Sequence, residues 1–439
     1  QRDATSMAET SGDRTPFPNP ADAGGGNTAP WPPPHPVVIV GGGFGGLYVA
    51  LALSTRRDPP PVLLVEPNER FVFLPLLYEL LSDELRPWEV APRYASLLAS
   101  RGIAWLRDRV ASIDAAAGTV TTTQGRCLPY SRLVVATGSR ANDFGIPGVG
   151  EHALQFRSLE DVERLQSLVQ QLKAQQRPLQ RLAIVGAGAS GVELACKLAD
   201  LLQGHAVLEL VEQGAELLPE ARAFNREQAR AALLRRDVRL RTHTRVEAVE
   251  AGRVTLRHEP AGGGAANTEH LSVDGVVWTA GVTVVAPAIT PVAAIDRRGR
   301  LLCHPDLSLV QHPNLYALGD VAHVADADGE PLPGTAQVAF QQADNLADNL
   351  IRSLAGEPTT PFRWNDLGEM ISLGIGEASL TGLGLTLAGS AAYRLRQLTY
   401  LGRLPGLPHQ LRVAAGWLSG LGRPLFATGE PARTPPPRP

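Results

Sequence analysis

The stretch from Pro36 to Leu53, PVVIVGGGFGGLYVALAL, constrains the fold of this chain more than any other. The four β-branched residues at 37–40 predict a buried strand, and the apolar run after the glycines predicts a helix. Between the two, Gly41, Gly43 and Gly46 form the pattern G-x-G-x-x-G. These glycines permit a tight turn, the approach of a pyrophosphate to the backbone and close packing of helix on strand. The phosphates would lie at the helix N-terminus, where the dipole favours an anion.

An acidic residue follows at the place where such a fold needs one. The next predicted strand, residues 62–65, is apolar and ends in Glu66. A carboxylate there can accept hydrogen bonds from the hydroxyls of an adenosine ribose. A glycine-rich turn alone is weak evidence, because such turns also occur for structural reasons. The strand, glycines, helix and acid together predict a dinucleotide-binding fold.

The same pattern occurs a second time, in residues 182–198 (LAIVGAGASGVELACKL). Its glycines hold equivalent positions: Gly186, Gly188 and Gly191. The strand predicted at 207–211 ends in Glu212, and each copy is followed by a further strand ending in glycine, VVATG at 134–138 and VWTAG at 277–281. A duplicated unit of this size predicts two Rossmann-like dinucleotide-binding folds, one for each of two cofactors.

Composition sets outer limits on the class of protein. With 439 residues, 44% hydrophobic and 19% charged, the chain is long enough for two or three domains with complete cores. Its net charge of −3 gives no general argument for binding nucleic acid. Cys127, Cys196 and Cys303 lie far apart, which argues against a disulfide framework and against a redox-active dithiol. No apolar run reaches the ~18 residues that a membrane-spanning helix needs, and no metal site is predicted.

Several segments permit both a structural and a functional interpretation. The apolar cluster at 71–77 is either a packed loop beneath the sheet or a wall beside a flat ring system. Segments 103–115 and 118–130 predict antiparallel strands. A later helix carries Gln337 and Gln341 on one face, because they are four residues apart. By itself this pair of amides usually means only a solvated face.

The C-terminal region has an uneven charge distribution, since residues 378–429 contain no Asp or Glu. Two helices are predicted, at about 385–401 and 410–418, each apolar on one side and basic on the other. The arginines of this region are Arg394, Arg396, Arg403, Arg412 and Arg423. They would suit a membrane interface with the arginines toward anionic headgroups. The alternative is an ordinary helical pair that covers the core or forms a dimer contact. Residues 1–35 and 428–439 are expected to be disordered.

These motifs resemble a known family. ATGS at 136–139, TAGV at 279–282 and LYALGDVA at 315–322, with the two glycine patterns, resemble the two-dinucleotide-binding-domain flavoproteins. FVFLPLLYELLS and PGTAQVAFQQADNL resemble type II NADH:quinone oxidoreductases. The sequences WNDLGEMISLG and YRLRQLTYLGRLPGLPHQLRVAAGW are similar to the cyanobacterial and plastid branch, whose members reduce prenylated naphthoquinones or plastoquinone. The resemblance covers about Val37 to Trp417.

The resemblance implies a domain order and an FAD site. Residues 36–148 and 290–360 would form the FAD-binding domain, 149–289 the NAD(P)H-binding domain, and 361–427 a helical membrane or dimer interface. FAD would contact the first glycine turn, two residues of the apolar cluster, the ATG strand end and the later Gly-Asp and Ala-Gln pairs. These residues are Gly41, Gly43, Gly45, Gly46, Glu66, Pro75, Leu76, Ala136, Thr137, Gly138, Gly319, Asp320, Ala336 and Gln337.

The resemblance also implies a nucleotide site and a reaction. NAD(P)H would contact Gly186, Gly188, Gly191, Glu193, Glu212, Ala280 and Gly281. Hydride would pass to FAD, and two electrons would then reach a membrane quinone without proton pumping. Glu193, Gln337 and Gln341 match the family's quinone-site residues, and Glu193 is a candidate proton relay. Because the Glu212 carboxylate attracts a hydroxyl and repels a phosphate, NADH is favoured over NADPH.

Two alternatives stay open, together with the compartment. A sulfide:quinone oxidoreductase shares this scaffold but needs cooperating cysteines, and Cys196 is expected to be a packed structural thiol. A redox sensor that binds FAD and NAD without turning over quinone is the non-enzymatic alternative. By resemblance, the protein would be a homodimer at the surface of a plastid or thylakoid membrane. The mitochondrial inner membrane and the bacterial plasma membrane are the other candidates.

Overall fold

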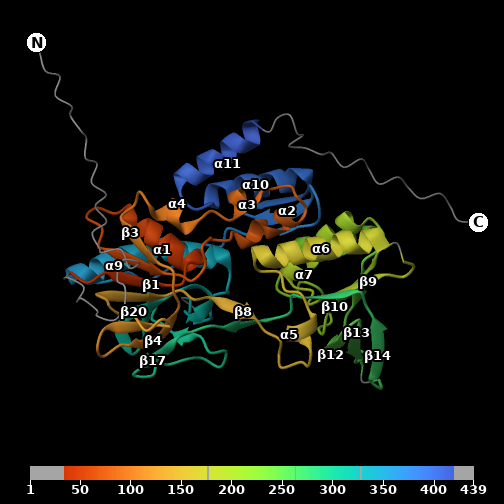
Figure 1. Cartoon of the computed structure of the whole chain (residues 1–439), viewed down its shortest axis with the longest axis horizontal. Helices are drawn as coiled ribbons and strands as arrows, with labels where there is room; N and C mark the ends of the chain where they lie inside the picture. Colours follow the sequence, from red (N-terminus) through yellow and green to blue (C-terminus); the bar gives the residue numbers. More distant parts are fainter. Residues whose placement is uncertain (1–33, 176, 263, 327–328, 420–439) are drawn as a thin grey trace, which may run out of the picture. The chain divides into compact units, whose positions relative to one another are not determined.

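The computed structural model describes residues 34–175, 177–262, 264–326 and 329–419 (Figure 1). The predicted terminal tails therefore lie outside the described residues, apart from positions 34 and 35. The chain forms two compact units, each assembled from separate segments. The first contains the chain up to Glu69, Tyr94–Thr137 and Ala286–Phe362, and the second contains Arg70–Arg93, Gly138–Val285 and the chain from Arg363. The predicted FAD-binding domain includes residues 70–93 and 138–148, which belong to the second unit, and it lacks residues 286–289, which belong to the first. The assignment of the domains to cofactors stays a prediction.

The first unit is built on a six-stranded sheet in the order β19-β20-β7-β1-β2-β3. Strands β20, β7, β1, β2 and β3 run parallel, and β19 pairs antiparallel with β20. Helices α1 and α9 pack together beside this sheet (Figure 1). The elements of this unit are β1 (Val37–Val40), α1 (Phe44–Ser54), β2 (Val62–Val65), α4 (Tyr94–Leu98), β3 (Ile103–Leu106), β4 (Val110–Asp114), β5 (Thr119–Thr122), β6 (Cys127–Pro129), β7 (Arg132–Val135), β17 (Ala288–Thr290), β18 (Leu301–Leu302), β19 (Ser308–Leu309), β20 (His312–Ala317), the 3-10 helix η2 (Gly319–Val321), β21 (Ala322–His323) and α9 (Ala336–Ala355).

The central strands of the first unit form because they are apolar on both faces. All residues of β1 and β2 are buried, as expected for a parallel sheet covered on both sides. The predicted strands at 37–40 and 62–65 are thus confirmed. Helix α9 begins where Thr335 caps it, since the Thr335 hydroxyl accepts a hydrogen bond from the Val338 N–H at 3.2 Å.

The second unit is built on a four-stranded parallel sheet in the order β11-β10-β9-β15. Between β11 and β15 the chain forms a separate antiparallel sheet, β12-β13-β14. Helix α10 packs on a third sheet, β22-β23-β24. The elements of this unit are the 3-10 helix η1 (Leu74–Leu76), α2 (Leu77–Leu81), α3 (Pro87–Val90), β8 (Ser139–Ala141), α5 (Val149–His152), α6 (Leu159–Gln175), β9 (Arg181–Val185), α7 (Ala189–Leu202), β10 (Val207–Val211), α8 (Ala223–Arg235), β11 (Arg239–Arg241), β12 (Thr244–Glu250), β13 (Arg253–His258), β14 (Asn267–Ser272), β15 (Gly275–Trp278), β16 (Val282–Val284), β22 (Glu369–Ser372), β23 (Ala378–Gly382), β24 (Leu385–Gly389), α10 (Ser390–Arg403) and α11 (Leu407–Ser419).

The duplicated pattern gives the same strand–helix–strand unit twice. Strands β1 and β2 flank α1, and β9 and β10 flank α7, with parallel pairing in both cases. Strands β7 and β15, which precede the sequences ATG and TAG, pair parallel with β1 and β9 respectively. The two dinucleotide-binding folds predicted from the sequence are therefore confirmed.

Two predictions of secondary structure were wrong in detail. The segment 103–115 is not one antiparallel strand: residues 103–106 form β3, parallel to β2, and only β4 pairs antiparallel with β5. The helix predicted from residue 385 begins at Ser390, because 385–389 form the edge strand β24. These five residues pair antiparallel with β23, and this pairing outweighs the helical pattern of the sequence. None of the helices in the described residues has the length and apolarity to span a bilayer.

Candidate functional site

The first glycine turn leaves no room for side chains where the chain folds back on itself. A Cβ atom on Gly46 would lie 1.8 Å from the carbonyl oxygen of Gly41, and one on Gly41 would lie 2.6 Å from that of Ala136. Gly45 faces Leu318 in the same way, at 2.9 Å. A Cβ atom on Gly43 would instead meet no protein atom within 4 Å. Gly43 is also the N-cap of α1, and it has no side chain that could occupy the helix N-terminus. The backbone at Gly43 is thus open to a ligand that approaches the helix N-terminus.

Glu66 is held beside this turn. Its Oε2 accepts a hydrogen bond from the Gly42 N–H at 2.7 Å, and its Oε1 accepts from the backbone and side-chain nitrogens of Asn68 at 2.9 and 2.7 Å. The Tyr94 hydroxyl closes the turn by donating to the Gly42 carbonyl at 2.7 Å. A carboxylate fixed in this way fits the recognition of ribose hydroxyls.

The other predicted flavin residues of the first unit lie at the ends of its strands. Ala136 and Thr137 follow β7, and Gly319 and Asp320 begin the short helix η2 after β20. The Gly319 N–H donates to the Gln342 side chain at 2.8 Å, which ties this turn to α9. Helix α9 starts at Ala336 and carries the remaining predicted residues, Gln337 and Gln341.

Three predicted flavin residues belong to the second unit. Gly138 is the last residue of the sequence ATG, and it has a φ of +66°, in the left-handed region that glycine adopts readily. Pro75 and Leu76 lie in η1, near the end of the apolar cluster. In that cluster Phe71, Phe73 and Leu76 are each 1% exposed.

The second glycine turn repeats the geometry of the first. A Cβ atom on Gly191 would lie 1.8 Å from the Gly186 carbonyl oxygen, whereas one on Gly188, the N-cap of α7, would meet nothing within 4 Å. Glu212 accepts hydrogen bonds from the N–H groups of Ala187 at 2.8 Å and Gly214 at 2.7 Å. The backbone of this turn thus has the same opening at the helix N-terminus.

Ala280 and Gly281 lie beside the second turn. The Ala280 Cα would be 2.9 Å from a Cβ on Gly186, and Trp278 donates its indole N–H to the Ala280 carbonyl at 3.0 Å. Gly281 has a φ of +67° and faces the ring of Phe144. All the predicted nucleotide residues belong to the second unit. Most follow β9, β10 or β15, whereas Glu193 lies within α7. Both turns offer a backbone cradle and a fixed carboxylate, so the residues present fit two dinucleotides.

Glu193 lies on α7 among other ionisable side chains. It is 8% exposed, and its Oε1 accepts the Ser372 N–H at 2.8 Å. The same oxygen lies 3.9 Å from Nη2 of Arg396. The pKa of Glu193 is raised to about 7: burial is the largest cause and the Glu79 carboxylate adds to it, while Arg396, the Ser372 N–H and the Tyr78 hydroxyl oppose the rise. A carboxyl group with such a pKa exchanges its proton near neutral pH.

Arg396 is buried, contrary to its expected place on the basic face of a C-terminal helix. Its side chain is 1% exposed; Nη1 forms an ion pair with Glu79, whose side chain is 0% exposed. Nη2 donates to the Pro75 carbonyl at 2.6 Å, and the guanidinium lies 4.8 Å from the centre of the Tyr400 ring. Arg396 therefore does not lie on the basic face that the sequence predicted for this helix. Burying the guanidinium requires an anionic partner, and Glu79 supplies it.

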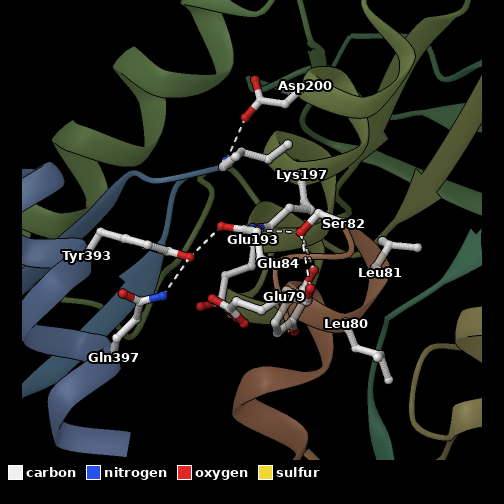
Figure 2. Close-up of polar contacts among 12 residues, drawn as sticks. Glu79, Leu80, Leu81, Ser82, Glu84, Glu193, Lys197, Asp200, Tyr393 and Gln397 are labelled. Atoms are coloured by element: carbon white, nitrogen blue, oxygen red, sulfur yellow. Dashed lines mark hydrogen bonds and ion pairs between the residues drawn. The ribbon is translucent and has the colours of Figure 1, made fainter. Parts of the chain in front are cut away.

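A second ion pair involves Lys197, which lies one turn of α7 beyond Glu193. Lys197 is fully buried and pairs with Glu84, which also accepts hydrogen bonds from Tyr393 of α10 and from Ser82. Figure 2 shows these groups converging from three segments, and Gln397 donates to the Tyr393 hydroxyl at 3.1 Å. Burial raises the pKa of Tyr393, and Glu84 adds to this shift. Segment 70–93, α7 and α10 are thus linked by charge as well as by apolar packing.

The comparisons with known proteins agree with this geometry. The pyridine nucleotide-disulphide oxidoreductase family matches residues 35–343. Demethylphylloquinone reductase NdbB of Synechocystis is 39% identical over 87% of this chain and 94% of its own length. The alternative NAD(P)H-ubiquinone oxidoreductase C1 of Arabidopsis thaliana is 36% identical over 86% and 79%. The solved structure of NDH2 from Plasmodium falciparum in complex with NADH superposes with a TM-score of 0.76 at 16% identity, covering 89% of this chain and 99% of that one.

The chain belongs to the type II NAD(P)H:quinone oxidoreductase family. It is therefore a flavoprotein oxidoreductase of the two-dinucleotide-binding-domain class, as the resemblance predicted. Proteins of this class bind FAD and NAD(P)H, and the two cradles described above fit them. The structural match, at its low identity, bears on the fold alone.

The cysteines of this type II oxidoreductase do not form a reactive pair. Cys127, Cys196 and Cys303 are all free. Cys196 is buried in α7, and burial raises its pKa to about 12, which confirms the prediction of a packed structural thiol. Cys127 is exposed, and burial raises the pKa of Cys303 to about 12. The chemistry of a sulfide:quinone oxidoreductase, which needs cooperating thiols, has no support here.

The sequence did not reveal the partners of Glu193. Glu79 and Arg396 are 317 residues apart, so no local spacing connects them. One sign was present: Glu79 is the single charge in LLYELL, and Arg396 lies in a C-terminal stretch that contains no acidic residue. A charge with no local partner in such a run is a candidate for a buried ion pair.

Proposed function

We propose that this enzyme holds FAD in the first fold, takes its electrons from NADH bound to the second fold, and reduces a membrane naphthoquinone. The observation that carries this proposal is the pair of matching cradles, each with a carboxylate fixed by two backbone N–H groups. The quinone class is taken from the relative in Synechocystis, a demethylphylloquinone reductase. A benzoquinone is the alternative, because the Arabidopsis relative is an NAD(P)H-ubiquinone oxidoreductase.

Different residues of the proposed FAD site would contact different parts of the cofactor. Gly41, Gly43 and Gly46 would approach the pyrophosphate and Glu66 the adenosine ribose. The Asp320 turn would face the ribitol side, and the start of α9 at Ala336 the flavin, where the helix dipole favours negative charge. These residues would hold FAD, whose chemistry is to take up a hydride and release two electrons. The protein contributes position, exclusion of water and charge.

NADH is the proposed reductant because of Glu212 and of the arginines that the structure commits elsewhere. The Glu212 carboxylate is fixed by Ala187 and Gly214, so a 2′-phosphate would meet a fixed negative charge. Arg226 donates to the carbonyls of Leu218, Pro219 and Ala221, and it also pairs with Glu216. Arg222 pairs with Asp366 at 2.8 Å. Both arginines therefore have anionic or carbonyl partners that a 2′-phosphate would have to displace.

The quinone site is assigned to Glu193, Gln337 and Gln341 by family resemblance. The contacts of Glu193 support the assignment, since its buried carboxyl is able to hold and release a proton at neutral pH. Quinone reduction needs protons as well as electrons, and Glu193 would supply one of them.

The C-terminal helices are proposed to bind an anionic membrane surface. Four leucines of α10 and α11 have side chains more than half exposed: Leu398, Leu407, Leu411 and Leu418. Arg394 and Arg412 are exposed on the same helices, so apolar and basic groups occur together. This combination suits an interfacial helix pair. A homodimer contact through the same leucines is the alternative, and a plastid or thylakoid membrane is the proposed location.

Anaerobic stopped-flow absorbance tests this proposal. The flavin-loaded protein is mixed with NADH or NADPH and then with a soluble naphthoquinone, while the flavin band is followed. We expect fast bleaching by NADH, slower bleaching by NADPH, and prompt recovery on adding the quinone. Equal bleaching by both nucleotides would remove the argument from Glu212. Bleaching without recovery, in the presence of lipid, would favour a redox sensor over a quinone reductase.

A further inference from the structure

A large aromatic side chain is exposed in the turn that follows β8. Phe144 is 56% exposed, and its φ of +52° lies in the left-handed region that bulky residues rarely adopt. Ile146, two residues further along the same turn, packs against the core of the second unit instead. An exposed ring and an unfavourable backbone conformation each cost free energy. The packing of the core therefore does not account for the position of Phe144.

Hydrogen bonds fix the backbone that carries this ring. The Phe144 N–H donates to Oδ1 of Asn142 at 2.9 Å, and the Gly145 N–H donates to Oδ1 of Asp143 at 2.9 Å. The Asn142 carbonyl in turn accepts the indole N–H of Trp278 at 2.8 Å. Trp278 is the last residue of β15 and is 4% exposed. The turn is thus tied to the end of a buried strand of the second dinucleotide-binding fold.

The ring lies at the edge of the second glycine turn. A Cβ atom on Gly281 would lie 2.3 Å from the Phe144 ring, and one on Gly186 would lie 2.9 Å from the Ala280 Cα. A series of close contacts therefore leads from the glycine turn through Ala280 and Gly281 to the ring. Val282, the next residue, is also 56% exposed, so this edge of the turn is apolar.

The order of the strands determines which half of a nucleotide would reach the ring. Strands β10 and β15 lie on opposite sides of β9, and Glu212, the proposed contact of the adenosine ribose, follows β10. Ligands of such sheets bind beyond the carboxyl ends of the strands, with the pyrophosphate at the N-terminus of the helix after the glycine turn. A dinucleotide whose adenosine lies at β10 extends its other half toward β15. The nicotinamide would therefore lie beside Gly281 and Phe144.

We propose that Phe144 is a binding residue for the nicotinamide ring, which packs against the exposed phenyl ring. This inference rests on the proposed binding of NADH to the second fold. The bound nicotinamide covers apolar surface that is otherwise in contact with water, and two flat rings pack favourably. Because the turn already holds the phenyl ring in place, little conformational freedom is lost on binding. The strained backbone at Phe144 is thus explained by its position at the ligand.

The test compares the binding of NAD⁺ and of ADP-ribose to the oxidised, flavin-loaded protein by titration calorimetry. The two ligands share every part except the nicotinamide ring. Phe144→Gly removes the phenyl ring, and glycine suits the left-handed backbone, so the turn should keep its conformation. We expect this variant to raise the Kd of NAD⁺ about tenfold and to change the Kd of ADP-ribose by less than about twofold. Phe144→Tyr keeps an aromatic ring and should bind both ligands as the wild type does.

Thermal unfolding separates this role from a merely structural one. Relief of backbone strain should leave the Tm of Phe144→Gly unchanged or higher, whereas loss of a structural contact would lower it. Leu234→Ala is the matched control, because it removes another exposed apolar side chain of the second unit, 77% exposed on α8, and should leave both affinities unchanged.

The proposal is overturned if Phe144→Gly binds NAD⁺ as tightly as the wild type, or if its affinities for NAD⁺ and ADP-ribose fall equally. If Phe144→Gly fails to fold, Phe144→Leu, which keeps an apolar side chain without a ring, decides by the same comparison of the two ligands. A wild-type protein that binds neither ligand would instead refute the nucleotide site, and with it the proposed function.

Discussion

The two dinucleotide-binding folds are nearly the same at the turn and different along the helix. A Cβ atom on Gly46 or on Gly191 would lie 1.8 Å from the carbonyl oxygen of the first glycine of its own turn. Glu66 and Glu212 are each held by one N–H group within the glycine turn and another two residues further along. The equivalence thus extends from the sequence pattern to individual hydrogen bonds.

The differences show how one fold can serve two roles. In the first fold Glu66 is 7% exposed, and Asn68 and Tyr94 add side-chain contacts that enclose the turn. In the second, Gly214 stands where the first fold has Asn68, so the carboxylate is less enclosed. A closed cradle suits a cofactor that stays bound, and a more open one suits a substrate that must leave.

The helices differ even more. Tyr48 and Ala52 of α1 are equivalent to Glu193 and Lys197 of α7, so the second fold has an acidic and a basic side chain where the first has a phenol and a methyl group. Both groups are buried and both have partners in segment 70–93 or in α10. The second fold therefore carries charge into its core, and this is the difference that the following variants probe.

The largest expected effect is that of Lys197→Met. It leaves Glu84 without its buried cation and should lower the free energy of unfolding by about 3–5 kcal/mol. Urea unfolding of the flavin-loaded protein measures this. Adding Glu84→Gln should recover part of the loss, because neither charge then remains unpaired. A double variant less stable than Lys197→Met would contradict the ion pair as the source of the effect.

Glu193 should make stability depend on pH. Its pKa rises from an ordinary value of 4.5 to about 7 on folding, so the native state binds more protons than the unfolded state in between. Stability contributed by this group is therefore present below about pH 4.5 and is lost as pH rises to about 7, by about 3 kcal/mol in total. Unfolding midpoints across this pH range measure the loss. Glu193→Gln should remove this part of the pH dependence, and an unchanged slope in the variant would show that another group titrates.

Gly46→Ala and Gly191→Ala should each destabilise their own fold by about 1–3 kcal/mol, because the added methyl group collides with backbone. Differential unfolding should show that Gly46→Ala also releases FAD, whereas Gly191→Ala keeps it. Flavin absorbance after gel filtration separates the two. Equal loss of flavin from both variants would mean that the folds do not act independently.

Glu212→Gln should have the smallest effect. Removing the negative charge should raise the efficiency with NADPH relative to NADH by about tenfold, which corresponds to about 1.4 kcal/mol. Steady-state kcat/KM for both nucleotides measures the ratio, with Glu66→Gln as the control in the first fold. A similar change of ratio in that control would refute the assignment of nucleotide choice to Glu212.

Local patterns in the sequence sufficed to predict the parts of the fold that depend on local structure. The glycines, Glu66, Glu212 and the parallel strands follow from short-range spacing, and the structure places them as expected. Arg396 shows the limit of this approach. Amphipathic periodicity placed it on a basic surface, but its partner Glu79 lies 317 residues away and reverses its orientation. Likewise, residues 385–389 form a strand because they pair with β23, and the helical periodicity of this segment gives no sign of that pairing.

The most direct test of the division of labour between the two folds uses the matched variants Gly43→Ala and Gly188→Ala. Neither added methyl group meets a protein atom within 4 Å, so both proteins should fold. We expect Gly43→Ala to be isolated without flavin, and Gly188→Ala to be yellow but to bleach far more slowly with NADH than the wild type does. A yellow Gly43→Ala protein, together with a colourless Gly188→Ala protein, would reverse the assignment of the two cofactors.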